Sequence, residues 1–169
     1  ANGKKLHNYS YLLDKFKDKI EALCTIKNFT ILHGDYCLSN ILYDVNNQIV
    51  RLIDPRGSFG SKGIYGDPRY DVAKMRHSIS GCYDYIVGDL FYVENEGNNF
   101  NFSIFNNPNT DELAIHLDKL IEANGYSIED IKLIEGLLFL SMLPYHADYF
   151  ERQQMMYLQG LFILNELCD

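Results

Sequence analysis

The spacing of apolar residues divides this chain of 169 residues into unequal parts. Between residues 29 and 54 the apolar residues form short runs rich in β-branched side chains, with turn residues between them, which is typical of short strands. Before this segment, and again after residue 67, they recur every three to four residues, the period of an amphipathic helix. The pattern predicts an α+β fold that is mainly helical, with a small β element.

Turn and capping residues set the limits of these elements. Asp67 followed by Pro68 is a helix-start signal, because Pro suits the first turn and the Asp side chain can cap exposed amides. Ser127 with Asp130 resembles a capping box, although Glu or Gln is the usual partner. In chain order we expect a helix over residues 9–26, strands over 29–32, 41–44 and 49–54, one kinked helix or two helices over 67–91, a surface hairpin over 92–105, and helices over 110–123 and 127–167 with a break near Pro144.

Composition narrows the classes of partner and compartment. The length is that of one domain, and 47% hydrophobic residues are ample for a core. A net charge of −8 argues against a nucleic-acid partner. Because the sequence has no apolar run of about 18 residues, we expect no membrane contact. The scattered cysteines and the lack of a signal-peptide pattern predict a cytoplasmic protein without a zinc site.

Polar residues gather in the stretch LHGDYCLSNILYD, residues 32–44, where they cannot help to build a core. Asp35 and Asn40 lie in a loop between two expected strands, and Asp54 ends the next strand. Transfer of a phosphoryl group from ATP to a hydroxyl needs a base for the hydroxyl and oxygen ligands for magnesium. Asp35 would supply the base, and Asn40 and Asp54 the ligands. Taken singly, Asp35 and Asn40 could instead be turn residues that cap the backbone.

The order of three motifs, HGDYCLSN, then LIDPRG, then GDPRYDVAK, resembles the aminoglycoside phosphotransferase and choline kinase family over roughly residues 29–80. The resemblance implies the C-terminal, catalytic lobe of a protein-kinase-like fold, with ATP and magnesium as cofactors. It also implies that Asp35 is the catalytic base and that Asn40 and Asp54 are metal ligands. By the same resemblance, His33 would belong to the catalytic loop and orient it. Asp71 would be the structural brace of that loop, or it could simply lie in the first turn of a helix.

Two departures from the family pattern leave details open. Residues 36–39, YCLS, lack the His-Pro of many members, so the fine shape of the loop is not fixed. Pro55 and Arg56 stand where the family often has an aromatic or acidic residue, so the local metal geometry is open too. Arg56 would contact a phosphate or be an ordinary surface residue. Two aromatic pairs near the C-terminus would line a substrate pocket, cage a cation or belong to the core: Tyr145/Tyr149 and His146/Phe150.

The function that follows is an ATP- and magnesium-dependent phosphotransferase with an alcohol group as acceptor. The acceptor would be a small metabolite of the choline, aminoglycoside, sugar or amino-acid type, and the sequence does not choose among these classes. The alternative is a non-catalytic pseudokinase or interaction module that retains the fold.

The whole chain, residues 1–169, is predicted to be one kinase-like C-terminal lobe. No GxGxxG motif and no strand-borne lysine precede His33, and the chain starts without methionine. We therefore expect the N-terminal nucleotide-binding lobe to lie outside this chain. The chain alone would then be weakly active or inactive. Apolar residues would be exposed on the face meant for that lobe and would allow self-association.

Overall fold

The chain folds as an α+β protein in the computed structural model, which describes residues 1–26 and 28–168. Helices make up about half of the chain, and the strands form small antiparallel pairs. This agrees with the mainly helical α+β fold expected from the apolar spacing. No helix in the two described ranges is long and apolar enough to cross a membrane.

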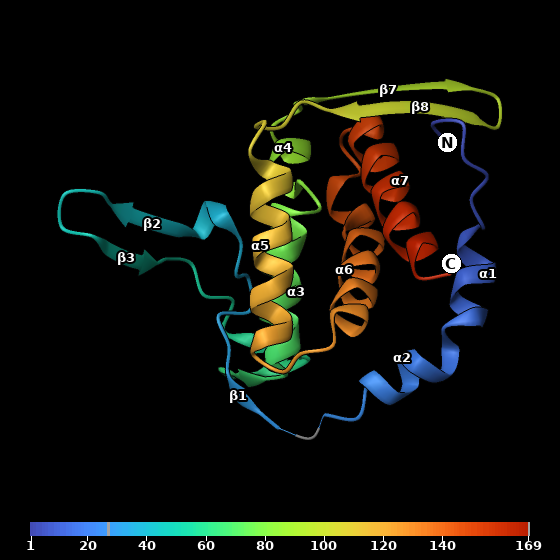
Figure 1. The fold of residues 1–169 in the computed structure, drawn as a ribbon. Coiled ribbons are helices and arrows are strands. Elements are labelled where there is room, and N and C mark those ends of the chain that lie inside the picture. The colour runs from blue at the N-terminus through green and yellow to red at the C-terminus, as the bar shows by residue number, and fades with distance from the viewer. Residues whose placement is uncertain (27, 169) are drawn as a thin grey trace.

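Four helices form the body of the molecule (Figure 1). α6 (Ile128–Met142) packs between α3 (Pro68–Ile79) and α7 (Phe150–Glu166), and α5 (Thr110–Ala123) lies against α3. Their apolar residues recur at helical spacing and therefore meet in a shared core. The buried core includes Ala73, Ile121, Ile131, Leu133, Phe139, Met155, Met156 and Leu164.

The start of α3 and the break after it follow the expected signals. The Asp67 carboxylate accepts a first-turn backbone N–H at 3.0 Å, and Pro68 is the first helical residue. The region over 67–91 holds two helices, because α4 (Tyr83–Val87) begins after a break at Gly81. A Cβ atom at Gly81 would lie only 2.6 Å from the Phe139 ring, so close packing also requires glycine there.

The expected limits of the later helices are confirmed as well. The Ser127 hydroxyl accepts the Asp130 N–H at 3.2 Å and caps α6. Pro144 lies in a 3-10 turn (Leu143–His146) that separates α6 from α7. The helix expected over residues 110–123 is α5, with the same limits.

A single helix over residues 9–26 was the wrong expectation. The structure has two short helices, α1 (Tyr9–Lys15) and α2 (Lys17–Leu23), which meet at Phe16. The backbone of Phe16 departs from helical geometry, with φ −97° and ψ 8°, and its ring is buried beside Leu12. The bend lets both halves follow the surface of the body, which one straight helix would leave (Figure 1).

The strands are short. The β2–β3 hairpin (residues 41–52) projects from one side of the body, and the β7–β8 hairpin (residues 91–104) lies across one end of it beside α7 (Figure 1). The β2–β3 hairpin extends away from the helices, so Leu42, Val50 and Leu52 are exposed on it. Exposed apolar residues were expected, whereas self-association through them stays a prediction. The pairs are β1 (Thr30–Ile31) with β6 (Tyr65–Gly66), β2 (Ile41–Asp44) with β3 (Ile49–Leu52), β4 (Ser58–Phe59) with β5 (Ser61–Lys62), and β7 (Phe91–Glu96) with β8 (Asn99–Ile104).

Candidate active site

One face of α3 holds the loop that follows β1. Asp71, Lys74 and Ser78 are spaced by three and four residues, which places their side chains on one side of the helix. Each of them binds a different point of residues 33–38. The loop is therefore positioned by a long helix of the body as well as by its short flanking strands.

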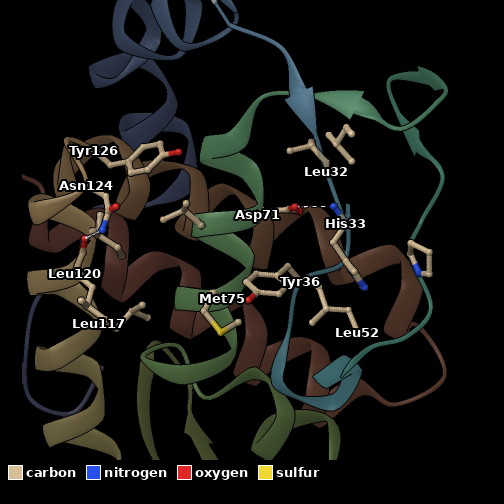
Figure 2. A pocket seen from close by; sticks show the side chains of 14 residues that line it. Leu32, His33, Tyr36, Leu52, Asp71, Met75, Leu117, Leu120, Asn124 and Tyr126 are labelled. Carbon is tan, nitrogen blue, oxygen red and sulfur yellow. Dashed lines mark hydrogen bonds between the residues drawn. The ribbon is translucent and has the colours of Figure 1, made fainter. Parts of the chain in front are cut away.

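Asp71 binds the start of the loop. Its two carboxylate oxygens accept the backbone N–H groups of His33 at 2.7 Å and Gly34 at 2.9 Å, and Figure 2 shows the first of these bonds. Asp71 is half-buried, and a carboxylate drawn out of water needs such partners. The hydrogen bonds expected of the loop brace are present.

Lys74 binds the carboxylate that the sequence assigns as the base. Its Nζ lies 2.8 Å from Asp35 Oδ1, and it lies 5.2 Å from the centroid of the Tyr83 ring. The Lys74 side chain is only 2% exposed, whereas that of Asp35 is 33% exposed. The lysine is therefore enclosed, and the carboxylate remains within reach of a solute.

Ser78 binds the middle of the loop. Its hydroxyl accepts the Leu38 N–H at 2.9 Å and donates to the carboxylate of Asp84 on α4. Because a hydroxyl can accept and donate at the same time, one serine links the loop to both helices. The network continues the contacts of Asp71 and Lys74 along α3.

Asn40 closes the loop back on Asp35. Its Nδ2 donates to the Asp35 backbone carbonyl at 2.9 Å and to Asp35 Oδ2 at 3.2 Å. Both partners are acceptors, so the amide nitrogen must face them and the amide oxygen faces away. Within residues 1–26 and 28–168, no hydrogen bond engages that oxygen.

Asp54 lies at the same end of the β2–β3 hairpin as Asn40. The N–H of Ile53 donates to the Asn40 carbonyl at 3.0 Å, so Asp54 follows directly after this cross-strand bond. Asp54 is exposed and has a left-handed backbone, with φ 56°. Such conformations in residues other than glycine persist only where the surrounding structure enforces them, and they cluster at functional sites.

The donor set of Asn40 and Asp54 fits a magnesium ion. It offers one amide oxygen and one carboxylate, and magnesium accepts one or two carboxylates together with water and phosphate oxygens. Across the described part of the chain, no group of three or more His, Cys, Asp or Glu side chains could hold a metal ion. A metal held by this pair would therefore take its remaining ligands from water and phosphate.

His33 connects the two loops of the site. Its Nδ1 accepts the Asp35 N–H at 3.3 Å, and its Nε2 lies 2.9 Å from the carbonyl oxygen of Ile53. The first bond requires an unprotonated Nδ1, so Nε2 carries the proton and donates to the carbonyl. With both ring nitrogens engaged, the geometry fits a residue that orients the loop rather than one that transfers protons.

Gly34 and Arg56 form a close contact between these loops. Gly34 has φ 78°, and a Cβ added there would lie 2.9 Å from Arg56 Cβ. The Arg56 N–H donates to the His33 carbonyl at 2.8 Å, and its guanidinium donates to the Tyr70 hydroxyl at 2.8 Å. Contact of Arg56 with a phosphate stays a prediction.

Tyr83, the first residue of α4, lies beside Lys74, the partner of Asp35. Burial and, after it, the negative charge of Asp35 raise the pKa of Tyr83 to about 12, so it stays protonated. The His146 ring lies 6.4 Å from the Tyr83 ring. Tyr145, Tyr149 and Phe150 are exposed, so assigning these three residues to the core is wrong, and His146 is half-buried.

An apolar cavity of about 630 Å³ lies beside the loop, between α3, α5 and the segment around His33 (Figure 2). His33, Tyr36 and Asp71 line it, but Asp35 does not. Asp35 instead turns toward Lys74 and Asn40. The cavity therefore lies on one side of the loop, and the Asp35 carboxylate faces another side.

Sequence reasoning found Asp71 but missed Lys74, Ser78 and Tyr83. For Lys74 and Ser78 the available signal was their spacing of three and seven residues from Asp71, which places all three on one face of the helix. Nothing in the order of residues indicated that the Tyr83 ring would lie beside Lys74, because that contact depends on the break before α4.

Comparison of the chain with protein-family models, with curated proteins and with solved structures gave no match. A function for this site therefore depends on its geometry and on the motifs in the sequence.

Proposed function

We propose that the chain is the kinase-like catalytic lobe of a phosphotransferase that uses ATP and magnesium and transfers the γ-phosphoryl group to a hydroxyl of a small molecule. The observation that carries this proposal is the exposure of the Asp35 carboxylate together with the partners that hold it. Its carboxylate is one third exposed and is held at one oxygen by Lys74 and at the other by Asn40. A base must be accessible and fixed in direction to act on a bound hydroxyl.

Asp35 orients the acceptor hydroxyl and takes its proton as the oxygen attacks the γ-phosphorus. A new bond forms between the acceptor oxygen and phosphorus, the bond from phosphorus to the β,γ-bridging oxygen breaks, and ADP leaves. Asn40 and Asp54 are the residues that would hold magnesium, which supplies charge neutralisation at the nucleotide phosphates. Lys74 keeps the carboxylate in place and adds a positive charge next to it.

A non-catalytic module is the second candidate function. The observation in its favour is the exposed apolar surface of the β2–β3 hairpin, which suits an interaction domain. The set of Asp35, Asn40, Lys74 and Asp71 favours the enzyme, because a binding module needs no base that is both accessible and fixed.

The test measures ADP release from magnesium-ATP with a panel of acceptors: choline, aminoglycosides, sugars and hydroxyl amino acids. The 169-residue chain and any longer product of the same gene are assayed side by side. Release that depends on one acceptor class supports the enzyme and names its substrate. If no acceptor raises ADP release above the ATP-only rate in either protein, the non-catalytic module is the better description.

A further inference from the structure

We propose that the cavity between α3, α5 and the His33 segment binds an uncharged, largely apolar small molecule. Its volume of about 630 Å³ falls in the range of roughly 300–1,000 Å³ that is usual for small-molecule sites. Because Asp35 does not line the cavity, this proposal is independent of phosphoryl transfer.

Four parts of the chain supply the apolar walls (Figure 2). Val72 and Met75 come from α3, Leu117 and Leu120 from α5, Leu32 from the segment after β1, and Leu52 from the end of β3. Apolar side chains that border open space stay in contact with water, which is unfavourable. A ligand with an apolar body would remove this surface from water, and that gain provides the driving force for binding.

The charges around the cavity argue for an uncharged ligand. His33 and Asp71 bring the imidazole and the carboxylate among the described lining residues, and both already have partners. Each Asp71 oxygen accepts a backbone N–H, and the His33 ring bonds to backbone groups at both nitrogens. Among the described lining residues an anionic ligand would meet no Lys or Arg, and a cationic ligand would find both Asp71 oxygens already accepting backbone N–H groups. A ligand of either charge would therefore lose hydration with little in return, and that loss is costly.

Polar side-chain groups on opposite walls of the cavity indicate which hydrogen-bonding groups the ligand has in addition to its apolar part. The hydroxyls of Tyr36 and Tyr126 have no protein hydrogen-bond partner within residues 1–26 and 28–168, and both side chains line the cavity (Figure 2). Asn124 donates its Nδ2 to the Leu120 carbonyl at 2.8 Å, which leaves its amide oxygen available. The class that fits is a ring compound bearing one or two hydroxyl, amine or amide groups that are uncharged at neutral pH.

The test uses N-phenyl-1-naphthylamine, a neutral fluorescent amine with a naphthyl and a phenyl group, as the probe. We expect saturable binding of one probe per chain. Its relative with an added sulfonate, 8-anilinonaphthalene-1-sulfonate, should bind this site at least 10-fold more weakly. The largest amide shifts in ¹H–¹⁵N spectra should fall at His33, Gly34, Leu117 and Leu120, because these residues line the cavity or bond to Asp71.

A matched pair of variants on α5 locates the site. Leu120 and Leu113 lie two turns apart on one side of the helix and are similarly exposed, at 49% and 47%, but only Leu120 lines the cavity. Leu120→Arg should weaken binding of the neutral probe at least 10-fold, and Leu113→Arg should change it less than twofold.

Three outcomes would overturn the proposal. The first is equal weakening by the two variants. The second is a set of amide shifts on the wild-type chain gathered away from the cavity, a measurement that needs no variant to fold. The third is a dimer that Leu120→Arg dissociates, since the cavity would then be an interface between two copies.

Discussion

The ammonium of Lys74 and the carboxylate of Asp35, 2.8 Å apart, form an ion pair in which only one partner is enclosed. Lys74 is 2% exposed and sits over the Tyr83 ring, whereas Asp35 is one third exposed. A carboxylate at this exposure can regain water if its partner is removed. An ammonium at 2% exposure cannot do so without a rearrangement. The two partners therefore depend on each other to different degrees.

This asymmetry predicts unequal stability losses. Asp35→Asn leaves the Lys74 charge buried without a counter-ion and should lower the free energy of unfolding by ~3 kcal/mol. Lys74→Met leaves a carboxylate that water can solvate and should cost about 1 kcal/mol or less. Urea unfolding of the two variants and of the double variant Asp35→Asn/Lys74→Met measures both effects. The double variant should be more stable than Asp35→Asn alone, and a larger loss in Lys74→Met than in Asp35→Asn would contradict this account.

The Lys74–Asp35 pair also affects how the role of Asp35 as the base must be tested. Asp35→Asn should lower turnover ~10²–10⁴-fold, the usual cost of losing a positioned base. Part of any loss in this variant could come from the unpaired lysine. In the double variant, stability should recover while turnover stays low. If the double variant regains more than about a tenth of the wild-type rate, Asp35 is not the base. The rate is measured with whichever acceptor the panel identifies.

The helical spacing of apolar residues in α3 and the capping of this helix by Asp67 could be predicted, because both signals are local in the sequence. The contact of Asp71 with the loop was predictable only through the order of motifs. The contact of Lys74 with the loop was not predictable, since a lysine on an amphipathic helix ordinarily faces water. Its burial depends on Tyr83, which follows the break between α3 and α4. The bend at Phe16 was missed for a related reason: the apolar spacing continues through it, and only packing against the body requires the change of direction.

The cavity and the backbone of Asp54 lay further beyond sequence reasoning. The cavity exists because α5 packs against α3, and no pattern in either helix specifies that contact. A strand was expected over residues 49–54, but β3 ends at Leu52, and Asp54, two residues further on, has a left-handed backbone.

Gly34 should tolerate no side chain, and Gly57 provides the matched control. Both have positive φ, 78° and 67°, but a Cβ at Gly57 meets nothing within 4 Å, whereas one at Gly34 collides with Arg56. Gly57→Ala should therefore cost only the backbone term of roughly 1–2 kcal/mol. Gly34→Ala should cost more, because the two loops must separate. Urea unfolding of the two variants compares the costs, and equal values would show that the contact with Arg56 is unimportant.

Glu135 should make the stability of the fold depend on pH. It is fully buried on α6 and bonded to Arg76. Burial raises the pKa of Glu135 to about 7 from 4.5, although the charge of Arg76 opposes the rise. Between these two values the folded state binds more protons than the unfolded state, so the contribution of Glu135 is present below about pH 4.5 and is lost as the pH rises to about 7.

Glu135→Gln removes this dependence while keeping an acceptor for Arg76. The free energy of unfolding of the variant minus that of the wild type should therefore rise across this window, by up to ~3 kcal/mol. A difference between variants is needed because His77 acts in the opposite direction: burial, with the nearby Lys74 charge, holds the pKa of His77 well below its usual value. Glu122→Gln, at an exposed position, controls for the loss of one charge. Denaturant unfolding from pH 4.5 to 7 gives the comparison, and parallel curves for Glu135→Gln and the wild type would show that Glu135 does not take up a proton on folding.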